Sequence, residues 1–263
     1  MSALIRSHPL VAYSVLAFAI SVALTLALNV SLVFGLLALF GPGTAALIVS
    51  RVSQGSAGLG DLWAVTGRWR VHPGWYLAAL GLPTAGFAIG HVAFVAAGNT
   101  MLPVPGSIQP IMFVLFVLVI GEEIGWRGFL LRHLLRDHSP LVATLTVGAV
   151  WSLWHTPLYF IPGMPSYGGP YLLFAAWAIA VSFLLTWLWL GTRSVVLATV
   201  MHGSANLAPS FVFPHTEPAM LFGFGAVGTA AVAVLLVALG WRLWISPPER
   251  QPTAEALPVA TSV

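Results

Sequence analysis

The chain has 263 residues, of which 59% are hydrophobic and only 6% are charged. Soluble domains carry about 25% charged residues. The composition therefore excludes an ordinary soluble protein and indicates an integral membrane protein. The net charge of +3 comes from arginines scattered beside apolar runs, which argues against a nucleic-acid-binding face. Cysteine is absent, which excludes disulfides, thiolate metal sites and a cysteine nucleophile.

Successive apolar runs predict an all-α fold, a polytopic transmembrane helical bundle with about eight spans. The first run is interpreted as a retained span, because it is longer than the apolar region of a signal peptide. Residues 1–245 therefore form one membrane domain, and the polar, Pro-rich residues 246–263 are expected to be a disordered cytoplasmic tail. In chain order, the expected spans are 9–28, 30–50, 75–97, 110–136, 139–161, 170–190, 194–213 and 219–245.

The arginine distribution predicts the orientation. If the N-terminus is cytoplasmic, every arginine except Arg127 lies in or next to the cytoplasmic side, and the external loops contain none. The cytoplasmic segment 51–74 is amphipathic and is expected to be a loop at the level of the lipid headgroups. We expect a multi-pass protein of the plasma membrane, and the lysine-free, Arg- and Ala-rich composition suggests a bacterial source.

The stretch "GEEIGWRG" at 121–128 places ionisable side chains inside an expected span. Such groups cost about 2.5–3.5 kcal/mol each on insertion and point to function. Glu123 and Arg127 are four residues apart, the better orientation for an ion pair on one helix face. Glu122 lacks that local partner and is free to face another helix, as a general base requires. The alternative is that all three form a salt-bridged knot that only stabilises the bundle.

Two later spans carry further polar motifs. "WSLWH" places Trp151 and His155 four residues apart, and "HGSAN" does the same for His202 and Asn206. Each motif on its own is equally consistent with hydrogen bonding between packed helices. The helical rise places Glu122 and both histidines towards the middle of their spans, so we expect them to converge.

Other protease signatures are missing from the sequence, since neither H-E-x-x-H nor G-x-S-x-G occurs. "GLGD" at 58–61 matches the G-x-G-D pattern of intramembrane aspartyl proteases. It falls in an expected polar loop, as does the only other aspartate, Asp137, so an aspartate dyad in the membrane is excluded. His91, between small residues, is interpreted as a packing residue.

In this order, the three motifs resemble those of the CPBP family of intramembrane proteases, the CAAX prenyl protease type II, bacteriocin-processing and abortive-infection group. The family pattern is E-E-x-x-x-R, F-x-x-x-H and H-x-x-x-N/B. The chain supplies "EEIGWR", "WSLWH" and "HGSAN" within a motif core of about 110–210, with Trp151 in place of the phenylalanine.

The resemblance implies an intramembrane endopeptidase that cleaves membrane-associated or lipidated proteins or peptides. Glu122, with His155, would activate the attacking water. His202 and Asn206 would stabilise the oxyanion of the tetrahedral intermediate. Supporting roles would fall to Glu123, Arg127 and Trp151.

The residues leave the cofactor open. Glu122, His155 and His202 could ligate a divalent metal such as zinc, or could activate water without one, and the metal-free version is preferred because Asn206 is a poor zinc ligand. The expected partners are a membrane protein or peptide substrate and the lipid bilayer, with no nucleic acid. Two alternatives are a non-catalytic membrane scaffold or chaperone on the same fold and a proton-coupled transporter, although no repeat in the sequence supports a transporter.

Overall fold

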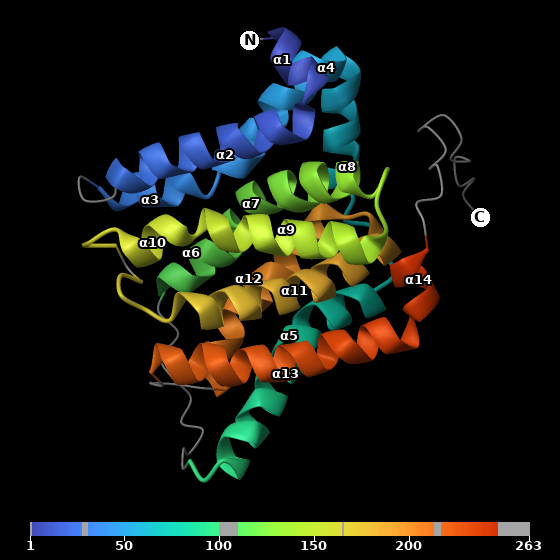
Figure 1. Cartoon of the computed structure of the whole chain (residues 1–263). Helices are drawn as coiled ribbons and strands as arrows, with labels where there is room; N and C mark the ends of the chain where they lie inside the picture. The colour runs from blue at the N-terminus through green and yellow to red at the C-terminus, as the bar shows by residue number, and fades with distance from the viewer. Residues whose placement is uncertain (1, 28–30, 100–109, 165, 213–216, 247–263) are drawn as a thin grey trace.

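The computed structural model describes residues 2–27, 31–99, 110–164, 166–212 and 217–246, and within these ranges all regular structure is helical, which confirms the all-α class (Figure 1). The expected tail from residue 247 onward and most of the expected external loop 98–109 lie outside the described residues. The elements are α1 Ser2–Ser7, α2 Pro9–Leu26, α3 Leu32–Ala38, α4 Gly41–Thr66, α5 Gly74–Ala96, α6 Pro110–Leu118, α7 Ile120–Gly125, a π-helical segment η2 Trp126–Leu131, α8 Arg132–Leu134, α9 Pro140–Trp154, α10 Thr156–Phe160, α11 Tyr171–Thr192, α12 Val195–Val212, α13 Pro218–Leu239 and α14 Trp241–Ile245.

Among the described residues, four helices are long and apolar enough to cross a membrane, namely α2, α5, α11 and α13. A fifth span results if α3 and α4, which meet at a bend of 46°, are counted as one. The eight expected spans are therefore confirmed only in part. The expected span 110–136 is divided among α6, α7, η2 and α8, and a break at His155, two residues before Pro157, separates α9 from α10. The cytoplasmic position of the N-terminus stays a prediction.

Segment 51–74 is helical as far as Thr66, and its expected position at the lipid headgroups stays a prediction. Helix α4 continues to Thr66 and bends at Gly55, whose φ of 68° and ψ of −142° are a backbone conformation that glycine adopts readily. Asp61 of the "GLGD" stretch lies on this helix, and its carboxylate pairs with the guanidinium of Arg132 at 2.9 Å. That ion pair gives Asp61 a structural role.

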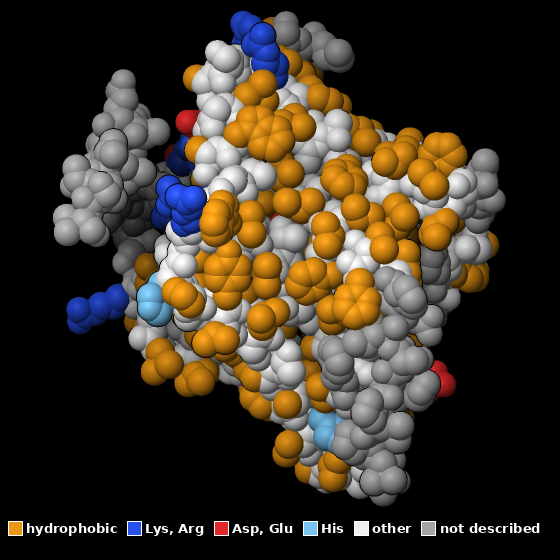
Figure 2. All heavy atoms as spheres, turned by 180° about the vertical axis from the view of Figure 1, so that it is seen from behind, with side chains coloured by type: hydrophobic (Ala, Val, Ile, Leu, Met, Phe, Trp, Pro, Cys, Tyr) orange, Lys and Arg blue, Asp and Glu red, His pale blue; other side chains and the backbone are white. Residues whose placement is uncertain are grey.

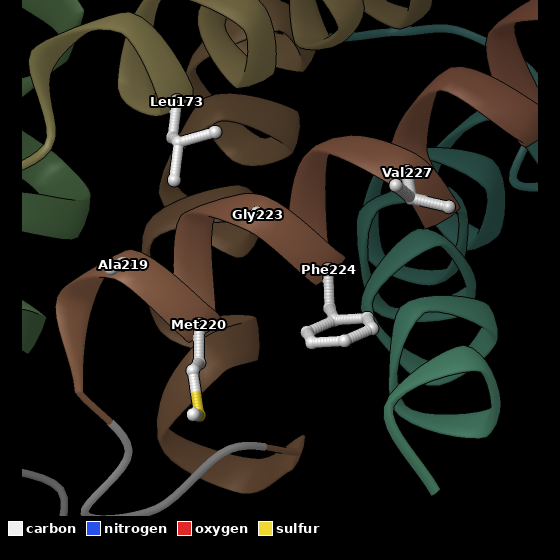
Figure 3. Close-up of a pocket in the computed structure, with 6 residues that line it drawn as sticks. All are labelled: Leu173, Ala219, Met220, Gly223, Phe224 and Val227. Carbon is white, nitrogen blue, oxygen red and sulfur yellow. The ribbon is translucent and has the colours of Figure 1, made fainter. Parts of the chain in front are cut away.

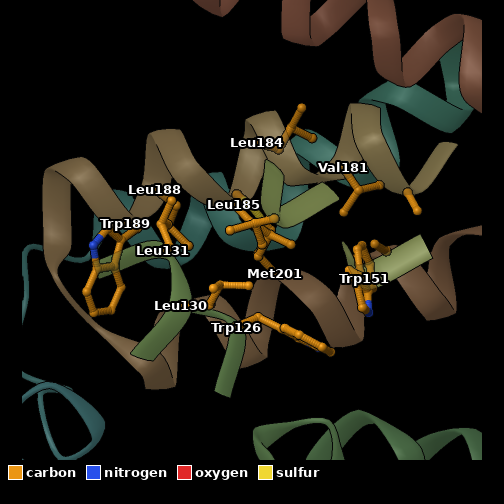
Figure 4. Close-up of a cluster of buried hydrophobic side chains, with 14 of the residues drawn as sticks. Trp126, Leu130, Leu131, Trp151, Val181, Leu184, Leu185, Leu188, Trp189 and Met201 are labelled. Atoms are coloured by element: carbon orange, nitrogen blue, oxygen red, sulfur yellow. The ribbon is translucent and has the colours of Figure 1, made fainter. Parts of the chain in front are cut away.

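The segment that carries the carboxylates runs through the middle of the bundle. Helix α4 packs on one side of α7, and α9, α11 and α12 contact α7 or η2 from other sides. Apolar side chains from these helices fill the interior around it, so polar groups placed here are removed from lipid and water (Figure 4). The cluster labelled in Figure 4 consists of Trp126, Leu130, Leu131, Trp151, Val181, Leu184, Leu185, Leu188, Trp189 and Met201.

The outer surface is suited to a bilayer. Figure 2 shows hydrophobic side chains spread over most of the face in view, with arginine side chains at its top and along its left edge. Exposed large apolar residues occur on most of the long helices, including Leu77 of α5, Leu172 of α11 and Val234 of α13. In water, so much apolar surface would favour aggregation, whereas in lipid it is the ordinary exterior of a membrane protein.

Two glycines that flank the carboxylates allow α7 to approach its neighbours closely. A Cβ on Gly121 would lie 2.8 Å from the carbonyl oxygen of Leu39. A Cβ on Gly125 would lie 2.5 Å from Cβ of Pro42 and 2.6 Å from the hydroxyl of Tyr13. Small residues four apart permit such backbone contact between membrane helices. The close contacts at the glycines of "GEEIG" therefore restrict the position of α7, the helix that carries Glu122 and Glu123.

We expect Gly125→Ala to lower the free energy of unfolding by about 1–3 kcal/mol, because the added methyl overpacks a filled contact. Gly81→Ala on α5 is the matched control, since a Cβ there meets nothing within 4 Å. The control is expected to be neutral or to stabilise by up to about 1 kcal/mol. Thermal unfolding of the two variants in the same detergent checks this, and equal stability would contradict the close packing at α7.

Candidate active site

The structure brings the three motifs together at the centre of the bundle. Glu122 and Glu123 lie on α7 and Arg127 on η2, while the second motif is at the end of α9 and the third is on α12. Glu122 and His202 are each only 2% exposed, and Glu123 and Arg127 are fully buried. His155 and Asn206 are partly exposed. The expected convergence is thus present, with one histidine and the asparagine on its accessible side.

The expected ion pair between Glu123 and Arg127 is present. Arg127 Nη1 donates to Glu123 Oε1 at 2.8 Å, and both side chains are fully buried. Arg127 Nη2 makes a longer contact of 3.4 Å with the hydroxyl of Ser182 on α11. Ser182 itself donates to the carbonyl of Ala178. Because a buried guanidinium without partners is costly, this second contact helps α11 to hold Arg127 in place.

Glu123 has a second partner that the sequence did not indicate. His202 Nδ1 lies 2.8 Å from Glu123 Oε1, the same oxygen that accepts from Arg127. A carboxylate paired with an arginine only accepts hydrogen bonds, so Nδ1 of His202 carries the proton in this contact. Glu123 therefore connects η2 to α12 and fixes the orientation of the imidazole, whose Nε2 is left for other partners.

Glu122 faces another helix, as the sequence predicts. Its Oε2 accepts a hydrogen bond of 2.9 Å from the indole Nε1 of Trp151 on α9. The Trp151 ring lies 5.0 Å from the ring of His202 and 5.7 Å from that of His155, both edge to face. The guanidinium carbon of Arg127 lies 5.3 Å from the indole centre, within cation–π range. Trp151 is therefore in contact with members of all three motifs.

His155 is oriented by its own helix. Its Nδ1 lies 2.9 Å from the backbone carbonyl oxygen of Trp151, four residues earlier. Since a carbonyl oxygen only accepts, the neutral ring carries its proton on Nδ1 and its lone pair on Nε2. Its ring lies 4.8 Å from each of the rings of Trp154 and Phe174. His155 thus presents a proton acceptor beside Trp151.

Asn206 and His91 complete the predicted polar residues. Asn206 follows His202 by one turn of α12, so the two side chains share a face. Between them, a Cβ on Gly203 would lie 2.5 Å from the Phe116 ring, so the glycine allows α6 to approach. His91 lies on α5 with its ring stacked 6.1 Å from that of Phe94, a packing contact.

The arrangement of donors does not fit a bound metal ion. Within the ranges that the structure describes, no three His, Asp or Glu side chains form a group that could hold one. Glu122 is turned to Trp151, and Nδ1 of His202 is turned to Glu123. Glu122, His155 and His202, the ligand set that the sequence left open, do not form such a group in the described part of the chain.

A surface groove of about 440 Å³ lies apart from these residues (Figure 3). It is formed by α11 and α13 and is almost entirely apolar. None of the site residues lines it, and on a lipid-facing surface an apolar groove needs no specific ligand. Its lining consists of Leu173, Ala219, Met220, Gly223, Phe224 and Val227.

Ser182 is the contact residue that the sequence analysis missed. It is fully buried on α11, among apolar side chains, and touches Arg127. The available signal was a small polar residue within the apolar run 171–192, which is easily taken for packing between helices. Its partner is 55 residues away, and only the packing of α11 on η2 reveals it.

Fold and site define a class: a multi-pass helical membrane protein with a buried centre of two carboxylates, an arginine and histidines. Residues 104–208, which include every candidate site residue, match the model of the type II CAAX prenyl endopeptidase Rce1-like family. The chain is also similar to the CAAX prenyl protease 2 of Methanococcus maripaludis, with 29% identity over 136 residues. That alignment covers 48% of this chain and 49% of the relative, so the chain spans about half the length of the protein it matches. Both comparisons support the resemblance to the CPBP family that the motifs indicate, and each covers less than half of the chain.

Proposed function

We propose that the chain is an intramembrane endopeptidase that hydrolyses peptide bonds of membrane-associated or lipidated substrates. The observation that carries the proposal is Glu122, a buried carboxylate whose one oxygen is held by Trp151, next to the histidines of two other helices. The matched family and the name of the relative support protease chemistry. We further propose that the protein resides in a bacterial plasma membrane with its N-terminus in the cytoplasm.

In the proposed reaction, Glu122 acts as general base. As the water oxygen attacks the scissile carbonyl carbon, its proton passes to Glu122, and that proton is later delivered to the departing amine. The indole hydrogen bond engages Oε2, and the proposed reaction uses Oε1 as the oxygen that takes the proton. The lone pair on Nε2 of His155 accepts a second hydrogen bond from this water and orients it.

The oxyanion that forms would be stabilised from α12. His202 donates through Nε2 when its ring is protonated on both nitrogens, and the carboxylate of Glu123 on Nδ1 stabilises that cation. The amide of Asn206 is the second donor, and one such donor commonly contributes about 10²–10³ in rate.

The test compares the protein termini of membranes that contain the wild type, Glu122→Gln or Asp61→Asn at equal abundance. Asp61 is the control because it pairs with Arg132 away from the site. The proposal expects new termini with wild type and Asp61→Asn only. If wild type produces no new termini, the protease assignment is wrong and the scaffold alternative gains support. If the folded Glu122→Gln variant produces the same new termini as wild type, another group activates the water.

We expect cleavage to persist after metal chelation, because no three His, Asp or Glu side chains of the described residues form a group that could hold a metal ion. The measurement is cleavage of a substrate found through its new terminus, before and after treatment with 1,10-phenanthroline. The non-chelating 1,7 isomer is the control. Loss of activity with the chelating isomer alone, reversed by added zinc, would establish a metal-dependent mechanism instead.

A further inference from the structure

We propose that Trp151 is a positioning residue, whose indole N–H holds Glu122 in the orientation that activates water. This inference rests on the proposed function, and it assigns a role to the one motif position where the chain departs from the family pattern. The pattern has phenylalanine there, and phenylalanine has no hydrogen-bond donor. The tryptophan therefore adds a contact that the pattern residue cannot make.

The contact is specific and sheltered. Trp151 Nε1 and Glu122 Oε2 are 2.9 Å apart, and the two side chains are 1% and 2% exposed. Water does not compete for the bond, and hydrogen bonds to a charged group are stronger than those between neutral groups. The bond also joins α9 to α7 across 29 residues of sequence. It therefore fixes the carboxylate relative to the helix that carries His155.

A neutral donor suits this position because the guanidinium of Arg127 and the imidazole of His202 both lie near Glu122. Arg127 is bound to the adjacent Glu123, and His202 lies within electrostatic range of Glu122. A carboxylate that is free to rotate would be drawn into an ion pair with one of them and would lose its capacity to accept a proton. The indole N–H satisfies one oxygen without adding charge, so the carboxylate stays available as a base.

The indole is itself held in place. The His202 and His155 rings pack against it edge to face, and the Arg127 guanidinium lies near its centre. A side chain with contacts on several sides cannot change rotamer without displacing these groups. The direction of the N–H, and with it the position of Glu122, is therefore set by the whole site.

The experiment compares Trp151→Phe with Trp189→Phe. Both tryptophans are almost fully buried, and they lie at opposite ends of the cluster in Figure 4. Among the described residues, the Nε1 of Trp189 has no hydrogen-bond partner, so the control removes an unused donor with the same change of volume. We expect Trp151→Phe to lower kcat by about 10–100-fold with little change in KM, and Trp189→Phe to stay near wild type. Equal kcat values for the two variants would overturn the inference.

A thermal-unfolding cycle tests the same contact without proteolysis. If Trp151 holds Glu122, the Tm losses of Trp151→Phe and Glu122→Ala are not additive in the double variant, whereas Trp189→Phe and Glu122→Ala are additive. Additive Tm losses for Trp151→Phe and Glu122→Ala would refute the contact between these two residues, even if no substrate were cleaved. An inactive Glu122→Gln with a fully active Trp151→Phe refutes this inference alone. An active Glu122→Gln refutes the proposed role of Glu122 as general base, and a wild type that cleaves nothing refutes the proposed function.

Discussion

Glu122→Gln is expected to lower the rate of substrate cleavage by about 10²–10⁴-fold, the usual contribution of a general base. The amide has nearly the size of the carboxylate, and its oxygen still accepts from Trp151, so the fold and the indole contact are preserved. What the variant loses is the ability to take a proton from water.

The measurement is the single-turnover rate of purified wild type and variant on a substrate identified by its new terminus. Asp61→Asn removes an acid that is partly exposed and pairs with Arg132, and it is expected to keep the wild-type rate. A Glu122→Gln rate within a few-fold of wild type would show that another group activates the water. The thermal unfolding of each variant serves as the check on folding.

The second large effect concerns stability. Arg127→Met is expected to lower the free energy of unfolding by about 3–5 kcal/mol, because it leaves the charge of Glu123 buried and largely uncompensated. Both partners are fully buried in the structure, and Arg127 is also the group that α11 contacts through Ser182. Equilibrium unfolding in a fixed detergent mixture measures the change.

A second ion pair of the same chain provides the contrast. Arg132 and Asp61 are 2.9 Å apart, but their side chains are 22% and 38% exposed, so Arg132→Met is expected to cost about 0–1 kcal/mol. The double variant Glu123→Gln with Arg127→Met should recover part of the loss, because no unpaired charge stays buried. Equal effects of Arg127→Met and Arg132→Met would contradict the burial on which this prediction depends.

The local part of the site could be predicted from the sequence because helix geometry determines which residues share a face. The spacing of Glu123 and Arg127 gives an ion pair on one helix, and the structure contains it. The polar motifs within apolar runs likewise indicated a buried centre, because isolated polar groups in a membrane gather with one another. These inferences need only the sequence and the energy of burial.

The contacts between helices could not be predicted in this way. Glu123 binds His202 from 79 residues away, and Glu122 binds Trp151 from 29 residues away. Both contacts depend on how α7, α9 and α12 are rotated against one another. The rotation of α7 is restricted by close approaches of Gly121 to Leu39 and of Gly125 to Pro42, and such approaches have no signature in the periodicity of the sequence.

The predicted boundaries of the helices were wrong for a related reason. Composition predicted continuous spans, but the run 110–136 changes to a π-helix at Trp126–Leu131, directly after the carboxylates. Such π-helical turns are frequent at functional sites and have little signature in composition. Segment 51–74 was interpreted as a connection between spans because it is amphipathic, and as far as Thr66 it belongs to α4, which packs against α1, α7 and η2. In that segment, contacts with neighbouring helices outweighed the weak helix propensity of the residues.

The most direct test of the account uses purified protein. Wild type or Glu122→Gln, each in lipid vesicles, is fused with membranes from cells that lack the chain, and new protein termini are identified over time. We expect termini that accumulate with wild type and are absent with Glu122→Gln. Termini that form equally with both proteins, or with neither although both are folded, would contradict the claim that Glu122 activates water to cleave membrane substrates.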